Sequence, residues 1–298
     1  VTIVNIDFRS LLHRLGKRKQ KQPAVMALDI VEVGNDTVDY GQNDKVSKHI
    51  PEGVSSKMLY QDIVTIAWPS FLEMTLTQLA SMVDMMMVGQ LGSWAISSVG
   101  LTTQPKFLLM LMFMAMNVGA TALVARYKGE GSPQKANKIL RQAFLLTFVL
   151  SLVSSIFGYI YAEDMVRFMG ASEAITLKQG TIYLRIQMLG FVPLALTSTA
   201  TASLRGVGST RISMVYNLIA NLVNVFFNYG LIGGRMGFPK MGVAGASLAT
   251  IIGQSVAFVL AITALLRGNQ YIRLNLKEGF EPDWQAMKSK LTAMEMFL

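Results

Sequence analysis

Two carboxylates lie in an apolar stretch of the chain, where an ionisable group is costly. Glu73 and Asp84 fall within residues 67–92, a run rich in leucine, methionine and valine that also contains Pro69. On an α-helix the two acids would share one face, about 16 Å apart along the axis. An acid at membrane depth usually faces a bundle interior or a wet cavity. The pair therefore predicts a polar functional site inside a bundle of membrane helices.

Four asparagines recur at helical spacing later in the chain. Asn217, Asn221, Asn224 and Asn228 are separated by 4, 3 and 4 residues, which places them on one helical face. Amides in contact with lipid would lose hydrogen bonds, so this face must contact another helix or water. Two interpretations stay open: amide bonding between helices alone, or a small-cation site in which carboxylate and amide oxygens are ligands.

Other chemistries lack the residues that they need. The chain has no cysteine, and its two histidines, His13 and His49, lie in the polar N-terminal region. The sequence contains no phosphate loop and no serine-nucleophile elbow, so we expect neither an enzyme nor a bound cofactor. The net charge of +9 is expected to reflect basic cytoplasmic loops. Nucleic-acid binding is not expected, because these basic residues flank apolar segments without interleaved aromatic residues.

The composition is that of a polytopic membrane protein, with 52% hydrophobic and 15% charged residues over a length of 298. A helix needs roughly 20 apolar residues to cross the hydrocarbon core. Six stretches of suitable length follow the polar N-terminal region: residues 60–88, 97–125, 139–161, 176–204, 211–232 and 242–266. The first has the weakest hydropathy because of its acids, and Pro193 is expected to kink the fourth. We predict an all-α fold with a six-helix transmembrane bundle over residues 58–266.

The basic residues predict the orientation of this bundle. They concentrate in the connection after the second stretch, in the connection after the fourth, and beyond the sixth. These residues are Arg126, Lys128, Lys135, Lys138, Arg141, Arg205, Arg211, Arg267, Arg273, Lys277, Lys288 and Lys290. The alternate connections carry far fewer. The positive-inside rule therefore places both termini of the chain in the cytoplasm, in a multi-pass protein of the inner or plasma membrane.

The two ends of the chain are expected to differ from the bundle. Residues 1–57 are polar and mixed in charge, which predicts a disordered cytoplasmic tail. Residues 267–298 are expected to form a cytoplasmic linker followed by the start of a seventh helix that is cut off. Apolar residues recur there at spacings of 4, 3 and 4: Met287, Leu291, Met294 and Leu298.

Three motifs resemble the multidrug and toxic compound extrusion (MATE) transporters. Residues 67–69 (A-W-P), with Val83-Asp84 and residues 88–92 (V-G-Q-L-G), resemble the first helix of that family. Residues 203–211 (S-L-R-G-V-G-S-T-R) are similar to its loop between helices four and five. Residues 224–232 and 239–250 resemble its signature from helix five into helix six. The chain is therefore identified as a MATE family member, truncated to the N-terminal six-helix lobe, over residues 58–298.

The resemblance implies a fold and a set of site residues. Two six-helix lobes, related by pseudo-two-fold symmetry, would enclose a drug cavity and alternate their access by rocking. Asp84 would bind the coupling ion, H⁺ or Na⁺, and Asn224 and Asn228 would complete a cation site that can take Na⁺, with a hydroxyl added by Thr250. Pro69 corresponds to the proline at which the first helix is proposed to bend, and is expected to act as a hinge.

Four further polar residues on the same two helical stretches are expected to line the substrate cavity. They are Glu73, Gln78, Asn217 and Asn221. The expected partners are a small organic substrate, the lipid bilayer and a missing C-terminal lobe.

The predicted function is a cation-coupled antiporter that exports organic, often cationic, drugs or toxins across the inner membrane. One alternative is a lipid-linked glycan flippase of the same superfamily, which a basic cavity would favour over an acidic, amide-lined one. A second is an inactive half-transporter fragment. An intramembrane aspartyl protease would need its carboxylates on separate, facing helices, whereas Glu73 and Asp84 share one predicted helix.

Overall fold

The computed structural model describes residues 56–268 and 271–274. The chain divides into two units, Val1–Val64 and Thr65–Leu298. Of the first unit, only residues 56–64 are described, and they begin a helix. The predicted tail therefore lies outside the described residues except for its last two positions, and so does the predicted start of a seventh helix.

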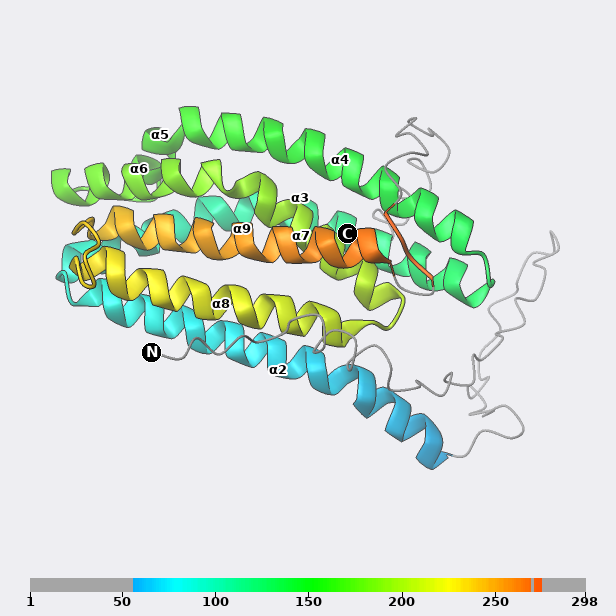
Figure 1. Cartoon of the computed structure of the whole chain (residues 1–298). Coiled ribbons are helices and arrows are strands. Elements are labelled where there is room, and N and C mark those ends of the chain that lie inside the picture. The colour runs from blue at the N-terminus through cyan, green and yellow to red at the C-terminus, as the bar shows by residue number, and fades with distance from the viewer. Residues whose placement is uncertain (1–55, 269–270, 275–298) are drawn as a thin grey trace, which may run out of the picture. The chain divides into compact units, whose positions relative to one another are not determined.

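All regular secondary structure within the described residues is helical, so the all-α prediction is confirmed. In chain order the helices are α2 (Ser56–Gly89), α3 (Ser93–Gly129), α4 (Pro133–Ile160), α5 (Ala162–Phe168), α6 (Ala174–Leu189), α7 (Phe191–Gly206), α8 (Thr210–Gly233) and α9 (Val243–Arg267) (Figure 1). Each predicted stretch corresponds to a helix, except that the fourth comprises both α6 and α7. The short helix α5 was not predicted.

Four of these helices, α3, α4, α8 and α9, are long and apolar enough to cross a membrane. The pair α6 and α7 is a fifth candidate span, bent by 52° at the break. Helix α2 does not meet the same criterion within the described residues, in line with the weak hydropathy expected from Glu73 and Asp84. The protein is thus an all-helical membrane bundle with four to five candidate spans, and a sixth crossing by α2 stays a prediction.

The kink predicted from Pro193 is confirmed at the junction of α6 and α7. Proline has no N–H to donate to the carbonyl four residues earlier, which is Leu189, the last residue of α6. Gly190 occupies the break, and a Cβ atom there would lie 2.6 Å from Cγ1 of Ile251 on α9. The bend is therefore fixed by two features: the missing hydrogen bond at the proline and the close approach of α9 to the glycine.

Helices α8 and α9 lie side by side with their backbones in close contact (Figure 1). A Cβ atom at Gly245 would lie 2.7 Å from the carbonyl oxygen of Leu231, and one at Gly253 would lie 2.8 Å from that of Ala220. Small residues permit such close packing between membrane helices. The added Cβ of Gly253 would also lie 2.9 Å from Cβ of Asn224, so α9 sets the position of the asparagine face of α8.

The remaining helices are joined by apolar clusters and by buried polar contacts. Phe113 of α3 and Phe191 of α7 meet edge to face, with ring centroids 5.5 Å apart. Asn117 of α3 donates to the Ser198 hydroxyl at 2.7 Å and accepts from the Thr199 hydroxyl at 3.0 Å, both on α7. These contacts satisfy buried polar groups between spans and hold α3 and α7 together beside the candidate site.

Candidate functional site

A line of hydrogen bonds joins α2 to α8 at a constant separation of 144 residues. Three amide nitrogens of α8 donate to three oxygens of α2: Asn217 to Glu73 Oε1 at 2.7 Å, Asn221 to Thr77 Oγ1 at 3.2 Å, and Asn228 to Asp84 Oδ1. The equal separations mean that the two helices run parallel in one register. The periodicity predicted that this face contacts another helix or water; in the structure it contacts a helix, α2.

At one end of this line, Asp84 is held by two amides. Asn228 is fully buried and donates to Oδ1 of Asp84. Asn224 is also buried, and its amide nitrogen faces Asp84, at 3.0 Å from Oδ1 and 2.9 Å from Oδ2. The oxygen of Asn224 then accepts from the backbone N–H of Thr250, at 3.2 Å. The amide orientation follows from these partners, because the reverse would set two acceptors against each other.

The structure thus brings together the four residues predicted as a cation site: Asp84, Asn224, Asn228 and Thr250. Asp84 itself is half-buried, and all of its amide contacts come from one face of α8. The side-chain oxygen of Asn228 is buried and has no hydrogen-bond partner among the described residues. An unpartnered buried acceptor next to a carboxylate is an oxygen ligand available to a cation. Within the described part of the chain, no three histidine, cysteine, aspartate or glutamate side chains lie so that they could together hold a metal ion.

At the other end of the line, Glu73 lies in a separate network. Its carboxylate forms an ion pair with Arg205 of α7, with Nη2 3.0 Å from Oε1. It also accepts from the Ser213 hydroxyl at 3.3 Å and from the Asn217 amide at 2.7 Å. The sequence analysis missed Arg205 as a site residue, since its position after the fourth stretch indicated a cytoplasmic loop charge. Nothing in the spacing of Glu73 and Asn217 along the sequence indicates that Arg205 contacts the same carboxylate.

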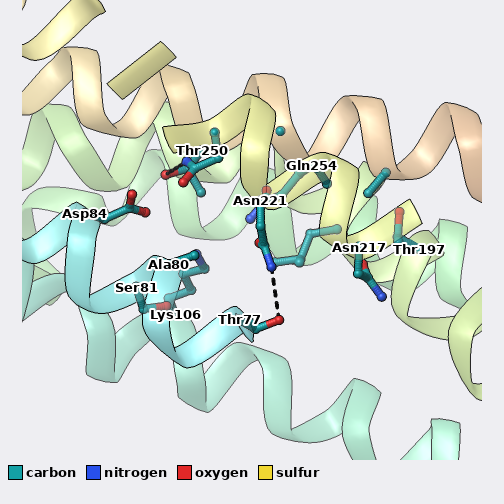
Figure 2. Close-up of a pocket in the computed structure, with 15 residues that line it drawn as sticks. Thr77, Ala80, Ser81, Asp84, Lys106, Thr197, Asn217, Asn221, Thr250 and Gln254 are labelled. Carbon is teal, nitrogen blue, oxygen red and sulfur yellow. Dashed lines mark hydrogen bonds between the residues drawn. The ribbon is translucent and has the colours of Figure 1, made fainter. Parts of the chain in front are cut away.

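A cavity of about 280 Å³ opens between α2, α3, α7, α8 and α9 (Figure 2). It is lined by Thr77, Ala80, Ser81, Asp84, Lys106, Leu194, Thr197, Asn217, Ala220, Asn221, Asn224, Thr250, Gly253, Gln254 and Ala257. Asn217 and Asn221, predicted as cavity residues, are among them. Glu73 and Gln78 are not: the carboxylate of Glu73 is taken up by Arg205, and Gln78 is exposed.

Lys106 of α3 is a cavity residue that the sequence analysis missed. It lies inside the predicted stretch 97–125, directly before an uncharged run from Phe107 to Ala125, and was given no role there. The observed helix begins at Ser93, so Lys106 lies about 20 Å from that end at 1.5 Å per residue. The cavity was expected to be acidic and lined by amides. It also contains one cationic side chain, which changes the electrostatics of the site.

Helix α2 continues without interruption through Pro69. Pro105 is likewise accommodated inside α3. The proposed hinge at Pro69 is therefore not a break in the observed helix, and its role in bending stays a prediction.

The sequence of the chain is similar to those of known transport proteins. The MatE family model matches residues 69–230, which include Pro69, Asp84, Asn224 and Asn228. The chain is 25% identical over 244 residues to a probable multidrug resistance protein NorM of Thermotoga maritima, covering 80% of this chain and 52% of that protein. It is 26% identical over 219 residues to the uncharacterized transporter YisQ of Bacillus subtilis, covering 73% of this chain and 48% of that protein.

Two solved structures with the same fold illustrate the similarity. A structure of MATE in the bent conformation matches with a TM-score of 0.70 at 20% identity, covering 79% of this chain and 52% of the other. An outward-facing structure of a multidrug resistance MATE family transporter of the MOP superfamily also matches with a TM-score of 0.70. That match has 22% identity and covers 78% of this chain and 52% of the other.

The present chain spans about half the length of the curated relatives that it matches. Its described helices correspond to one lobe of the MATE fold. The matched region covers most of the helical bundle, from the proline of α2 to the end of the asparagine face on α8. The chain belongs to the MATE family of transporters.

Proposed function

We propose that the chain forms the N-terminal lobe of a cation-coupled antiporter that exports small organic molecules across the inner membrane. The observation that carries this proposal is the position of Asp84, whose carboxylate is held by two amides at the wall of a polar cavity. One acidic group thereby belongs both to a candidate ion site and to a candidate substrate site. H⁺ and Na⁺ are the coupling ions that such a carboxylate can bind.

The two amides suit a carboxylate that alternates between a free and an ion-bound state. In the observed arrangement Asn224 and Asn228 present N–H donors, which stabilise an ionised, unoccupied carboxylate. A side-chain amide also has a carbonyl oxygen and can turn it toward a bound Na⁺ or toward the proton of a neutral carboxyl group. The side-chain oxygen of Asn228, which has no hydrogen-bond partner within the part of the chain that the structure describes, is available for this exchange.

Coupling follows from the competition of two ligands for the same wall of the cavity. When an ion binds, Asp84 loses its charge or shares it, and the amides of α8 change their contacts with α2. A ligand shifts a conformational equilibrium only by its differential affinity for the two states. Ion binding at Asp84 would favour one orientation of the lobe, and an organic molecule in the cavity would favour the other. Reciprocal coupling between the two binding events follows from linkage.

A second lobe completes the proposed transporter. The chain corresponds to about half of each relative, and the cavity between α2, α8 and α9 would face that second half. Both termini of the lobe would be cytoplasmic, as the basic connections after α3 and α7 indicate.

The proposal is tested in proteoliposomes that contain the transporter with this lobe. Efflux of ethidium is measured under an imposed Na⁺ gradient without a pH gradient, and then under a pH gradient without Na⁺. Efflux should follow one gradient, and Asp84→Asn should abolish the gradient-driven component while protein abundance is retained. Gln78→Ala, at an exposed position of the same helix, is the matched control. Undiminished coupled efflux by Asp84→Asn would refute the assignment of the ion site.

A further inference from the structure

The cavity contains a cationic group that the ion site does not use. Lys106 is partly buried on α3, about 20 Å from the start of that helix at 1.5 Å per residue. It lines the same cavity as Asp84 (Figure 2). A lysine at the end of a membrane helix can extend its ammonium group to the interface. Lys106 instead lies within the span, so its charge is placed in the cavity.

The Lys106 ammonium lacks an anionic partner in the described part of the chain. Its hydrogen bond goes to a neutral acceptor, with Nζ 2.9 Å from Oε1 of Gln187 on α6. Gln187 is itself buried, at 1% exposure, and its amide nitrogen has no partner among the described residues. A single amide oxygen compensates an ammonium group poorly, because desolvating a charge costs several kcal/mol and a paired anion is the usual remedy. Lys106 is therefore poised to accept a negatively charged group.

Asp84 does not supply that negative group. Its two oxygens are occupied by the amides of Asn224 and Asn228 on the α8 side of the cavity. Asp84 and Lys106 are the only charged side chains among the residues that line this described cavity. The lining thus offers one acidic and one basic position, on different helices. Uncharged polar groups of the same lining, such as Gln254 and Thr197, lie on the side of the cavity away from these two residues (Figure 2).

We propose that Lys106 is an anion-binding subsite of the substrate cavity, and that the transported molecules carry a carboxylate or an equivalent single negative charge. A zwitterion would satisfy Lys106 with its anionic group and Asp84 with its cationic group. This inference rests on the proposed function, since it takes the cavity to be the substrate site. It differs from the expectation of mainly cationic substrates, because a purely cationic molecule would leave Lys106 unpaired and would be repelled by it.

The test uses two dyes that differ by one ester. Rhodamine 110 has a free carboxylate and is zwitterionic, whereas rhodamine 123 is its methyl ester and is cationic. Binding of each dye to the purified full chain in neutral phosphatidylcholine nanodiscs is followed by fluorescence anisotropy, so that no anionic headgroup competes. The native chain should bind rhodamine 110 about tenfold more tightly than rhodamine 123, the range expected for one charged hydrogen bond.

Substitution at Lys106 locates the source of this preference. Lys106→Met, which keeps the length and removes the charge, should lose about tenfold in affinity for rhodamine 110 and change that for rhodamine 123 by less than about twofold. Lys106→Arg should retain the preference. Gln254→Met is the matched control, because it alters a neutral group of the same cavity and should affect both dyes alike.

Three results would overturn the subsite. They are equal binding of the two dyes by the native chain, no binding of rhodamine 110, or an equal effect of Lys106→Met on both dyes. The native comparison needs no substitution, so it stands even if a variant fails to fold. The binding test also needs no ion gradient. The two proposals can therefore fail separately. Tighter binding of rhodamine 110 that depends on Lys106 would support the subsite even if coupled efflux were not observed. Coupled efflux that depends on Asp84 would support the proposed function even if the two dyes bound equally.

Discussion

Asp84 on α2 and Asn228 on α8 form a hydrogen bond across 144 residues, and Glu73 and Asn217 form another across the same separation. Equal separations show that the two helices run parallel and keep one register from Glu73 to Asp84. Large apolar side chains of α2, such as Phe71, Met82 and Met86, are more than half exposed. Helix α2 is therefore held to α8 by polar contacts along its length more than by apolar packing.

The ion pair of Glu73 and Arg205 predicts unequal effects of removing either partner. Arg205→Ala should destabilise the protein by about 2–4 kcal/mol, because the buried carboxylate would keep only Ser213 and Asn217 as donors. Glu73→Gln should lower the free energy of unfolding by about 1 kcal/mol, because glutamine has the same shape as glutamate. The Arg205 side chain, which is 32% exposed, can then be hydrated by water. Thermal unfolding in detergent measures both.

The double variant tests whether the pair acts as a unit. Arg205→Ala combined with Glu73→Gln should be less destabilised than the sum of the single variants, because the neutral amide no longer needs the guanidinium. The exposed ion pair of Arg167 and Glu163 is the control, and its loss should cost less than about 1 kcal/mol. Additive effects at Glu73 and Arg205 would show that the buried contact contributes nothing beyond its separate side chains.

The amide of Asn228 predicts a stability loss that depends on pH. Asn228→Ala removes a donor to the Asp84 carboxylate and should cost about 1–3 kcal/mol when that carboxylate is ionised. At acidic pH the loss should shrink, because a protonated carboxyl group no longer requires two N–H donors. Unfolding of the native and variant chains is measured from about pH 3, below the ordinary carboxyl pKa of about 4, up to about pH 8. A loss that is constant with pH would mean that Asn228 acts only through packing.

Features of the site that depend on a single helix could be predicted from the sequence, whereas contacts between helices far apart in the chain could not. The asparagine face of α8 was predictable because its spacing of 4, 3 and 4 follows the helical period. The bend at Pro193 was predictable because a proline acts on its own helix. The Thr77 contact of Asn221 was not, since the separation of 144 residues is a property of how two distant helices pack.

The missed residues share one cause. Arg205 was assigned by its position just after an apolar stretch, where basic residues normally mark the membrane surface, and Lys106 was given no role although it lay inside a predicted stretch. Lys106 lay inside the predicted second stretch, 97–125, as it lies inside the observed helix α3, but its contact with the cavity comes from the packing of α2, α7, α8 and α9 around it. Whether a charge near a predicted boundary is buried depends on the opposing helices. Hydropathy along one chain segment contains no information about them.

The glycine contacts between α8 and α9 predict that added volume will disturb the ion site. Gly253→Ala places a Cβ atom 2.8 Å from the carbonyl of Ala220 and 2.9 Å from Cβ of Asn224. The helices must separate at the level of that amide, at a cost of about 1–3 kcal/mol. Thermal unfolding measures the cost. Gly100→Ala is the control, since a Cβ atom there meets nothing within 4 Å, and alanine is about 1 kcal/mol better in a helix. Equal stability of the two variants would contradict tight α8–α9 packing.

The absence of cysteine from the sequence allows the proposed orientation to be tested residue by residue. Single cysteines at three exposed positions report on the two faces of the membrane: Gln134 at the start of α4, Ser172 before α6, and Met236 between α8 and α9. If the basic connection between α3 and α4 is cytoplasmic, then Ser172→Cys and Met236→Cys should react with a membrane-impermeant maleimide in intact cells. Gln134→Cys should react only after permeabilisation, because Arg126 and Lys128 at the end of α3 and Lys135 at the start of α4 mark this side as cytoplasmic. The reverse labelling pattern would show that the lobe has the opposite orientation in the membrane. Labelling of Ser172→Cys and Met236→Cys from opposite sides would refute the assignment of α6 with α7 as one bent span.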